Sequence, residues 1–220
     1  MALPSYATPL DKAWYYSFRV ICALIFAFLI IPIFVIIPLS FNSEPYFTYP
    51  MPGFSFRWYA EFFNSQQWIL GLKNSIIVGV FATLVATVLG TLAALGLNRA
   101  EYPGKSAIMA VLISPIIVPI VITAASMFYF YAFIGLTGTL AGLVFAHATI
   151  GVPFVVITVS ATLAGFDNNL VRAGASLGAD PVKVFFKVTM PLILPGIVSG
   201  GLFAFITSWD ELVIAIFLAT

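Results

Sequence analysis

The amino-acid sequence predicts an all-α transmembrane protein, a helical bundle that forms a single domain over residues 1–220. Hydrophobic residues make up 62% of the chain and charged residues only 8%, whereas soluble domains carry about 25% charged residues. Apolar runs long enough to cross a bilayer predict spans at about residues 20–39, 75–97, 107–134, 140–163 and 192–209. The 22 Phe, 9 Tyr and 4 Trp residues suit contact with membrane lipid. A formal net charge of +1 gives no sign of nucleic acid as a partner.

The first apolar run extends from Val20 to Leu39, with Lys12 and Arg19 before it. A secretory signal peptide has a shorter apolar core of about 7–15 residues, followed by a small-residue cleavage site. This run is longer, and no such site follows it. We therefore expect an uncleaved first span, bent at Pro32.

Residues 41–73 are predicted to form an external loop, because prolines interrupt the sequence before an aromatic segment at residues 54–68. This segment is interpreted as an interfacial helix with its aromatic side chains at the lipid headgroups. Arg57 and Glu61 are four residues apart, so they would point to water and form a weak pair. A loop helix that packs on its own domain is an equally good interpretation.

The second span carries small residues at spacings of three and four, which lets helices pack closely in lipid: Gly79, Ala82, Ala86, Gly90 and Ala94. The loop after it contains Gly104-Lys105-Ser106, which matches the end of a phosphate-binding loop. The glycine required five places before Gly104 is Arg99, however, so the motif is incomplete. We expect no enzyme activity, no ATP hydrolysis and no cofactor in this chain.

The third span contains Pro115 and Pro119, each of which removes a backbone donor and bends a helix. A broken helix often lines a transport pathway. Ser126, Tyr129 and Tyr131 follow the prolines and are candidate pathway residues, although a belt of lipid-facing aromatic residues explains the two tyrosines as well.

The fourth span holds the only histidine of the chain, His147. A histidine within a span can bind substrate or carry a proton. The span offers neither a second histidine nor an acidic neighbour. A hydrogen bond to a neighbouring helix is therefore the expected role.

Residues 166–191 are predicted to form a cytoplasmic loop of two short helices. Asn168 or Asn169 caps the first helix, Gly178 ends it, and Asp180 caps the second with Pro181 at its first position. The second helix is predicted to be amphipathic and to lie flat at the membrane surface. Its apolar stripe is Val182, Phe185, Phe186 and Thr189, and Lys183 and Lys187 share another face.

This loop resembles the EAA motif of the permeases of ABC importers. The similarity rests on Ala173, Leu177-Gly178-Ala179, Phe185-Phe186, Val188, Pro191 and Pro195-Gly196, and Arg172 and Gly174 stand where the motif has glutamate and its second alanine. The resemblance implies a type I ABC importer permease-like bundle, with five visible spans of an expected six. It also implies a coupling helix that docks on an ATPase, with Arg172, Ala173, Gly174, Leu177, Gly178, Ala179 and Pro191 as the coupling residues.

The family resemblance further implies the partners of the chain. They are a homologous second permease, two copies of a cytoplasmic ATPase that holds ATP and magnesium, an external periplasmic solute-binding protein and membrane lipid. The expected location is the bacterial inner membrane.

The distribution of positive charge orients the predicted spans. One side carries seven Lys and Arg residues and the other carries only two, Arg57 and Lys73; the seven are Lys12, Arg19, Arg99, Lys105, Arg172, Lys183 and Lys187. Positive residues accumulate on the cytoplasmic side of membrane proteins. The amino terminus and the loop of residues 166–191 are therefore expected in the cytoplasm.

The last predicted span ends at Trp209, Asp210 and Glu211, and charges within apolar sequence are costly and usually functional. This ending resembles the polyamine and opine branch of the permease family. Trp209, Asp210 and Glu211, with Tyr129 and Tyr131, are the candidate contacts for a cationic amine. An ion pair at the helix end that controls gating or assembly is the alternative.

The predicted function is that of one permease of an ATP-driven importer. It would move a small cationic solute, such as putrescine, spermidine or an opine-like amine, by alternating access. An ion-coupled secondary transporter that uses Asp210, Glu211 and His147 is one alternative. A membrane scaffold without transport activity is another.

Overall fold

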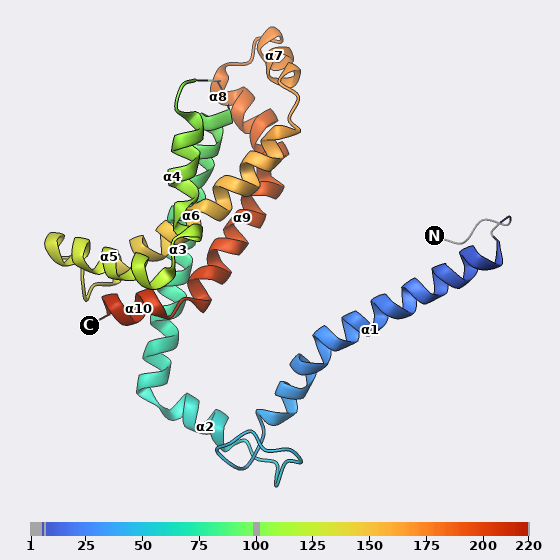
Figure 1. The fold of residues 1–220 in the computed structure, drawn as a ribbon. Coiled ribbons are helices and arrows are strands. Elements are labelled where there is room, and N and C mark those ends of the chain that lie inside the picture. Colours follow the sequence, from blue (N-terminus) through green and yellow to red (C-terminus); the bar gives the residue numbers. More distant parts are fainter. Residues whose placement is uncertain (1–5, 7, 99–101, 220) are drawn as a thin grey trace. The chain divides into compact units, whose positions relative to one another are not determined.

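The computed structural model describes residues 6, 8–98 and 102–219, and Arg99 lies outside these residues. The chain divides into two compact units, residues 1–69 and 70–220. The described part is helical apart from loops and a single isolated bridge (Figure 1). Its elements are α1 (Pro9–Leu39), α2 (Arg57–Asn64), α3 (Gln66–Asn98), α4 (Lys105–Ile117), α5 (Ile120–Ile134), α6 (Leu140–Ala164), α7 (Asn169–Ser176), α8 (Pro181–Val184), the π-helical turn η1 (Phe185–Thr189), α9 (Met190–Asp210) and α10 (Val213–Leu218).

Among the described residues, four helical stretches are long and apolar enough to cross a membrane: α1, α3, α6 and the continuous stretch Pro181–Asp210. The pair α4 and α5 passes the same test when counted together, which gives up to five spans. Both α1 and α3 begin earlier than the predicted apolar runs, at Pro9 and Gln66. A capping box explains the early start of α1, because Thr8 Oγ1 accepts from the Asp11 N–H and Asp11 Oδ2 accepts from the Thr8 N–H.

In the first unit, α2 packs on the loop that precedes it. Trp58 Nε1 donates to the backbone oxygen of Asn42 at 2.9 Å, and the Phe41 and Phe54 rings stack with centroids 5.0 Å apart. These contacts favour the interpretation of a loop helix packed on its own domain. The helix covers only Arg57–Asn64, because Ser65 is extended and α3 begins at Gln66.

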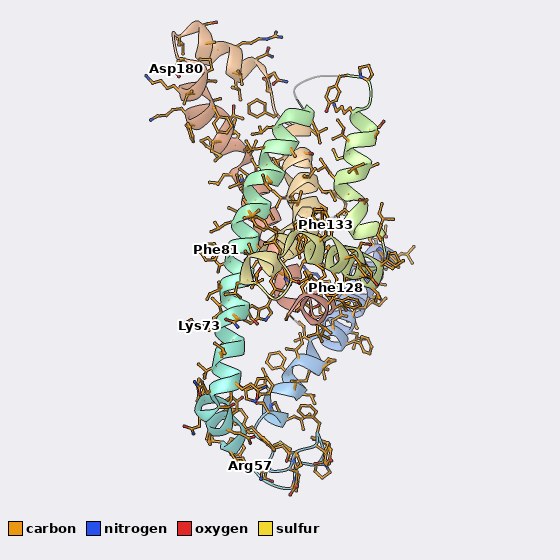
Figure 2. All side chains as sticks on the ribbon, turned by 90° about the vertical axis from the view of Figure 1, so that its left-hand side faces the viewer. Arg57, Lys73, Phe81, Phe128, Phe133 and Asp180 are labelled. Carbon is orange, nitrogen blue, oxygen red and sulfur yellow. The ribbon has the colours of Figure 1, made fainter. Side chains whose placement is uncertain are left out.

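The expected weak pair of Arg57 with Glu61 is not among the contacts of this described segment. Instead, the Arg57 guanidinium lies 4.3 Å from the centre of the Trp58 ring. An exposed ion pair contributes little, so stacking on the neighbouring indole competes well with it. Figure 2 shows Arg57 on the α2 helix.

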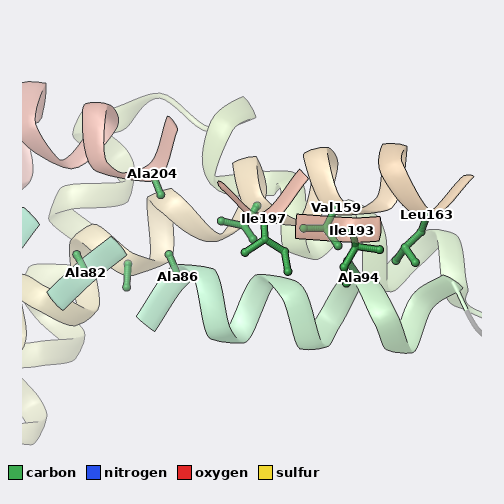
Figure 3. Packing of buried hydrophobic residues seen from close by; sticks show 10 residues of the cluster. Ala82, Ala86, Ala94, Val159, Leu163, Ile193, Ile197 and Ala204 are labelled. Atoms are coloured by element: carbon green, nitrogen blue, oxygen red, sulfur yellow. The ribbon is translucent and has the colours of Figure 1, made fainter. Parts of the chain in front are cut away.

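The core of the second unit lies where α3, α6 and α9 meet. Ala82, Ala86 and Ala94 of α3 are at most 1% exposed and pack with Val159 of α6 and Ile193 of α9 (Figure 3). The small-residue stripe predicted for the second span is therefore confirmed as a packing surface. Larger residues of α3 that point away from the core, such as Phe81, are exposed (Figure 2).

A second stripe of small residues lies on α9 and was not predicted. Gly196, Gly200, Ala204 and Ser208 recur at every fourth position. A Cβ on Gly200 would lie 2.7 Å from Val155 Cα of α6, and a Cβ on Gly151 of α6 would lie 3.0 Å from Ala204 Cβ. The backbones of α6 and α9 therefore approach closely along this stripe.

The third predicted span is broken, as its prolines predict. Helices α4 and α5 meet at an angle of 106° across Val118 and Pro119, whereas Pro115 lies inside α4. Proline cannot donate a backbone hydrogen bond, and Val118 before Pro119 is extended. The short helix α10 packs on α5 through Ile214 and Leu218, and the Gly138 N–H donates to the Leu218 carbonyl at 2.8 Å.

Candidate functional site

Helix α7 begins with Asn168 at the cap position, as predicted, but a neighbouring carboxylate supplies the side-chain bond. Asp167 Oδ1 accepts from the Asn169 N–H at 2.9 Å, while Asn168 occupies the cap position without a capping bond from its side chain. An aspartate bonds readily to a backbone N–H two residues ahead, and its negative charge suits the first turn of a helix. Asn168 therefore holds the predicted cap position, and the bond to the backbone comes from Asp167 in its place.

Helix α7 ends in a Schellman turn at Gly178, which confirms the predicted end. Gly178 has φ +80°, its N–H donates to the Ala175 carbonyl at 3.0 Å, and the Ala179 N–H donates to the Gly174 carbonyl at 3.2 Å. These two bonds satisfy carbonyls that the last helical turn leaves free. Glycine suits the position because it adopts a positive φ at little cost.

The second helix also begins as predicted. Asp180 Oδ1 accepts from the Lys183 N–H at 3.0 Å, and Pro181 occupies the first helical position. Figure 2 shows Asp180 at the end of the unit that α7 and α8 occupy.

The second helix of the loop is not the separate element that was predicted. Helix α8 continues through η1 into α9, so that residues 181–210 form one helical stretch of 30 residues. Of the predicted apolar stripe, Val182 and Phe186 are 65% and 60% exposed, whereas Val184, outside the stripe, is buried at 4%. Contact of the stripe with membrane lipid stays a prediction. The wider π-helical turn directly before Met190 and Pro191 changes which side chains share a face.

The coupling residues predicted on α7 divide into a packed side and an exposed side. Gly174 lies against α8, since a Cβ there would be 3.1 Å from Val184 Cγ2. Leu177 projects with 88% of its surface exposed, and Arg172 and Ala173 are exposed as well. A cavity of about 600 Å³ opens beneath α7, with Leu163, Phe166, Val171, Val184 and Phe185 among its lining residues.

At the other end of α9, Asp210 and Glu211 lie in different environments. Asp210 is the last residue of α9 and is exposed, whereas Glu211 is half-buried and extended. Glu211 Oε1 accepts from the Ile214 N–H at 2.9 Å and so caps the start of α10. Asp210 lies beside a hollow of about 460 Å³ that Phe205, Ile206 and Trp209 also line, where Trp209 stacks on Phe205 at 5.8 Å between centroids.

The other predicted pathway residues, all on α5, do not line this hollow. Tyr131 is 7% exposed and packs with α10, Tyr129 is 75% exposed, and Ser126 is exposed. Tyr129 and Tyr131 are two positions apart on a helix, which directs their side chains to opposite sides. Their contact with solute stays a prediction.

The predicted hydrogen bond of His147 to a neighbouring helix is confirmed. His147 Nδ1 lies 2.9 Å from Ser208 Oγ and 3.2 Å from the Ser208 carbonyl oxygen. Ser208 was not predicted as its partner. The four-residue period of Gly196, Gly200, Ala204 and Ser208 could have indicated it as part of a helix contact.

The comparisons with known proteins point to one family. A sequence model described as binding-protein-dependent transport system inner membrane component matches residues 86–220. The chain is 33% identical over 195 residues to the spermidine/putrescine transport system permease protein PotC of Haemophilus influenzae, covering 89% of this chain and 76% of the relative. It is 35% identical over 207 residues to the putrescine transport system permease protein PotI of Escherichia coli K12, covering 91% and 73%.

A solved structure shares the fold. The match is a chain of a bacterial ABC transporter involved in the import of the acidic polysaccharide alginate, with a TM-score of 0.71 and 16% sequence identity. It covers 94% of this chain and 75% of that chain. The all-α bundle predicted from the sequence is therefore an architecture found in ABC importers.

Proposed function

The chain belongs to the family of binding-protein-dependent transport system inner membrane components and is a permease subunit, and we propose that its solute is a polyamine such as putrescine or spermidine. Membership of this family makes it a multi-pass membrane protein and not an enzyme. Such permeases work with a partner permease, an ATPase and a binding protein. The relatives named for putrescine and spermidine transport match across most of the chain, which favours a polyamine over an opine-like amine.

The observation that carries the polyamine proposal is the position of Asp210. Its carboxylate is exposed at the end of α9, and Trp209 and Phe205 line the adjoining hollow. A carboxylate attracts an ammonium group, and an indole face binds the same group by cation–π attraction. A polyamine carries an ammonium group at each end, so one end would suffice for this contact.

Coupling to ATP would act through α7. The Schellman turn and the Gly174 contact fix this helix against α8, while Leu177 extends outward as an apolar contact for the ATPase. We propose two ATPase copies, which bind ATP and magnesium, a homologous second permease and a periplasmic solute-binding protein as the specific partners. Docking on a cytoplasmic ATPase requires α7 in the cytoplasm, which the charge count also favours, together with a cytoplasmic amino terminus.

Uptake by the assembled importer tests the proposed solute. Asp210→Asn should reduce putrescine uptake by about tenfold or more because the amide removes the charge attraction. Glu61→Gln, an exposed acid in α2, is the matched control and should leave uptake unchanged. Absence of putrescine uptake by the unaltered importer would refute the polyamine assignment. Equal loss of uptake for neutral and anionic solutes in Asp210→Asn would assign the residue to gating.

The ion-coupled transporter with Asp210, Glu211 and His147 is not favoured by the family membership. The geometry offers it little support either, since Glu211 caps α10 and His147 bonds to Ser208. Purification of the tagged chain decides between the two functions. An importer permease retains an ATPase partner, whereas a secondary transporter is purified without one and its uptake follows an ion gradient.

A further inference from the structure

His147 of α6 is buried beside the last turn of α9, and the permease function described above gives it no role. The side chain is 4% exposed, and Nδ1 lies within hydrogen-bond distance of both the hydroxyl and the carbonyl oxygen of Ser208. Nε2 is buried without a partner in the described structure. Buried polar side chains in proteins are normally hydrogen-bonded, and those within membrane-spanning segments usually have a function.

The end of α9 needs such a bond. The last four carbonyls of a helix accept no hydrogen bond from within the helix, and in an apolar environment a carbonyl without a donor is unfavourable. Ser208 is the third residue from the end, since Asp210 closes α9 and Glu211 is extended. Its carbonyl is therefore one of the four that require an outside donor.

The His147 ring bonds to Ser208 in either neutral tautomer, but only the tautomer with the proton on Nδ1 supplies the Ser208 carbonyl with a donor. With the proton on Nδ1, the ring donates to the Ser208 carbonyl; with the proton on Nε2, Nδ1 accepts from the Ser208 hydroxyl. The small-residue stripe brings the two residues together, because it places Gly200 against Val155 and Ala204 against Gly151 before it reaches Ser208. The α6 backbone is thereby close enough for the imidazole to reach across.

Helix α9 ends at Asp210 and α10 begins at Val213. On the α10 side of this interruption, the Glu211 carboxylate accepts from the Ile214 N–H at 2.9 Å. Asp210 lies between these two anchored points and remains exposed. The bonds of His147 and Glu211 thus anchor the backbone on both sides of Asp210.

We propose that His147 is a positioning residue that holds the end of α9 at Ser208 and thereby directs Asp210 toward the solute. This inference rests on the proposed function, in which Asp210 contacts a cationic amine. It assigns His147 no contact with the solute and no transfer of a proton.

The kinetic test uses the complete importer with His147→Leu, His147→Asn and Asp210→Asn. His147→Leu removes the bond, and we expect the KM for putrescine to rise about tenfold while the maximal rate changes less than about twofold. The asparagine amide can reach Ser208 from near the position of Nδ1, so His147→Asn should restore the KM to within about twofold. A purely structural role would lower the maximal rate and the amount of importer without this rescue.

A double variant shows whether His147 acts through Asp210. In the Asp210→Asn background, His147→Leu should change the KM less than about twofold, because the group it positions is already absent. A full tenfold effect in both backgrounds would overturn the proposal. Rescue by His147→Gln and not by His147→Asn would also overturn it, since glutamine places its amide near Nε2.

A labelling experiment separates this inference from the identity of the solute. In a Cys22→Ser background, Asp210→Cys provides the single thiol of the chain. Its reaction rate with a cationic methanethiosulfonate reagent should change about fivefold or more with His147→Leu and less than about twofold with His147→Asn. This result would stand even if the importer carried no polyamine, whereas equal rates in all three backgrounds would overturn the positioning role.

Discussion

Gly174 of α7 lies so close to Val184 of α8 that a Cβ on the glycine would be 3.1 Å from the valine Cγ2. Val184 is 4% exposed, so its side chain has little room to retreat. The contact connects the exposed helix α7 to the long helical stretch that starts at Pro181. Its tightness sets a size limit for position 174.

Two substitutions test this limit. Gly174→Ala should keep at least about half of the uptake, since Val184 need move only by a few tenths of an ångström. Gly174→Leu should abolish most uptake by pushing α7 away from α8, at a cost of about 1–3 kcal/mol for overpacking. Uptake and the amount of importer in the membrane are measured together. Full uptake with leucine would show that α7 does not need this contact.

Gly178→Leu should separate ATP hydrolysis from uptake. The added side chain meets open space, but φ +80° costs a residue other than glycine about 1–2 kcal/mol, so the turn should rearrange. We expect ATPase activity of the complex to continue while uptake falls about tenfold. Gly96→Ala is the control, because it also meets open space and lies in a regular helix. Unchanged uptake in Gly178→Leu would contradict a coupling role of the turn.

Leu177→Ser should weaken the association with the ATPase and leave the stability of the chain nearly unchanged. The side chain is 88% exposed, and substitutions at exposed positions change stability by about 0.5 kcal/mol or less. Co-purification of the ATPase with the tagged chain measures the association, and thermal melting in detergent measures the stability. Undiminished retention of the ATPase would exclude Leu177 from the docking surface.

Gly200→Ala should destabilise the bundle, because its Cβ would lie 2.7 Å from backbone of α6 that cannot rotate away. The expected loss is about 1–3 kcal/mol, seen as a lower melting temperature. Gly96→Ala again serves as the control, and there the better helix propensity of alanine should stabilise slightly. Equal melting temperatures for both variants would contradict the close approach of α6 and α9.

Local features were predictable because neighbouring residues determine them. The Gly178 end of α7, the Asp180 cap with Pro181, and the break at Pro119 all follow from the conformational limits of one or two residues. The bond between Asp167 and the Asn169 N–H was missed because Asn and Asp both bond well to the start of a helix, and the geometry of the turn decides which side chain does so.

Features that depend on distant residues were less predictable. The bond of His147 was expected, but its partner Ser208 lies 61 positions away and was not. The sequence did not predict that α8, η1 and α9 are continuous, because Pro191 and the capped start at Asp180 each indicate a helix boundary. The π-helical turn η1 shifts which side chains share a face of the helix, and no pattern of residues predicts such a turn.

The continuous helical stretch from Pro181 to Asp210 connects the two candidate sites, because α7 packs at its first residues and Asp210 is its last residue. Its 30 residues correspond to a length of about 45 Å at 1.5 Å per residue. If the Pro181 end served as the pivot, a rotation of about 10° would sweep Asp210 through roughly 8 Å, more than the length of a side chain. A small rotation at the Pro181 end would thus, by geometry alone, displace the Asp210 carboxylate by more than its own length.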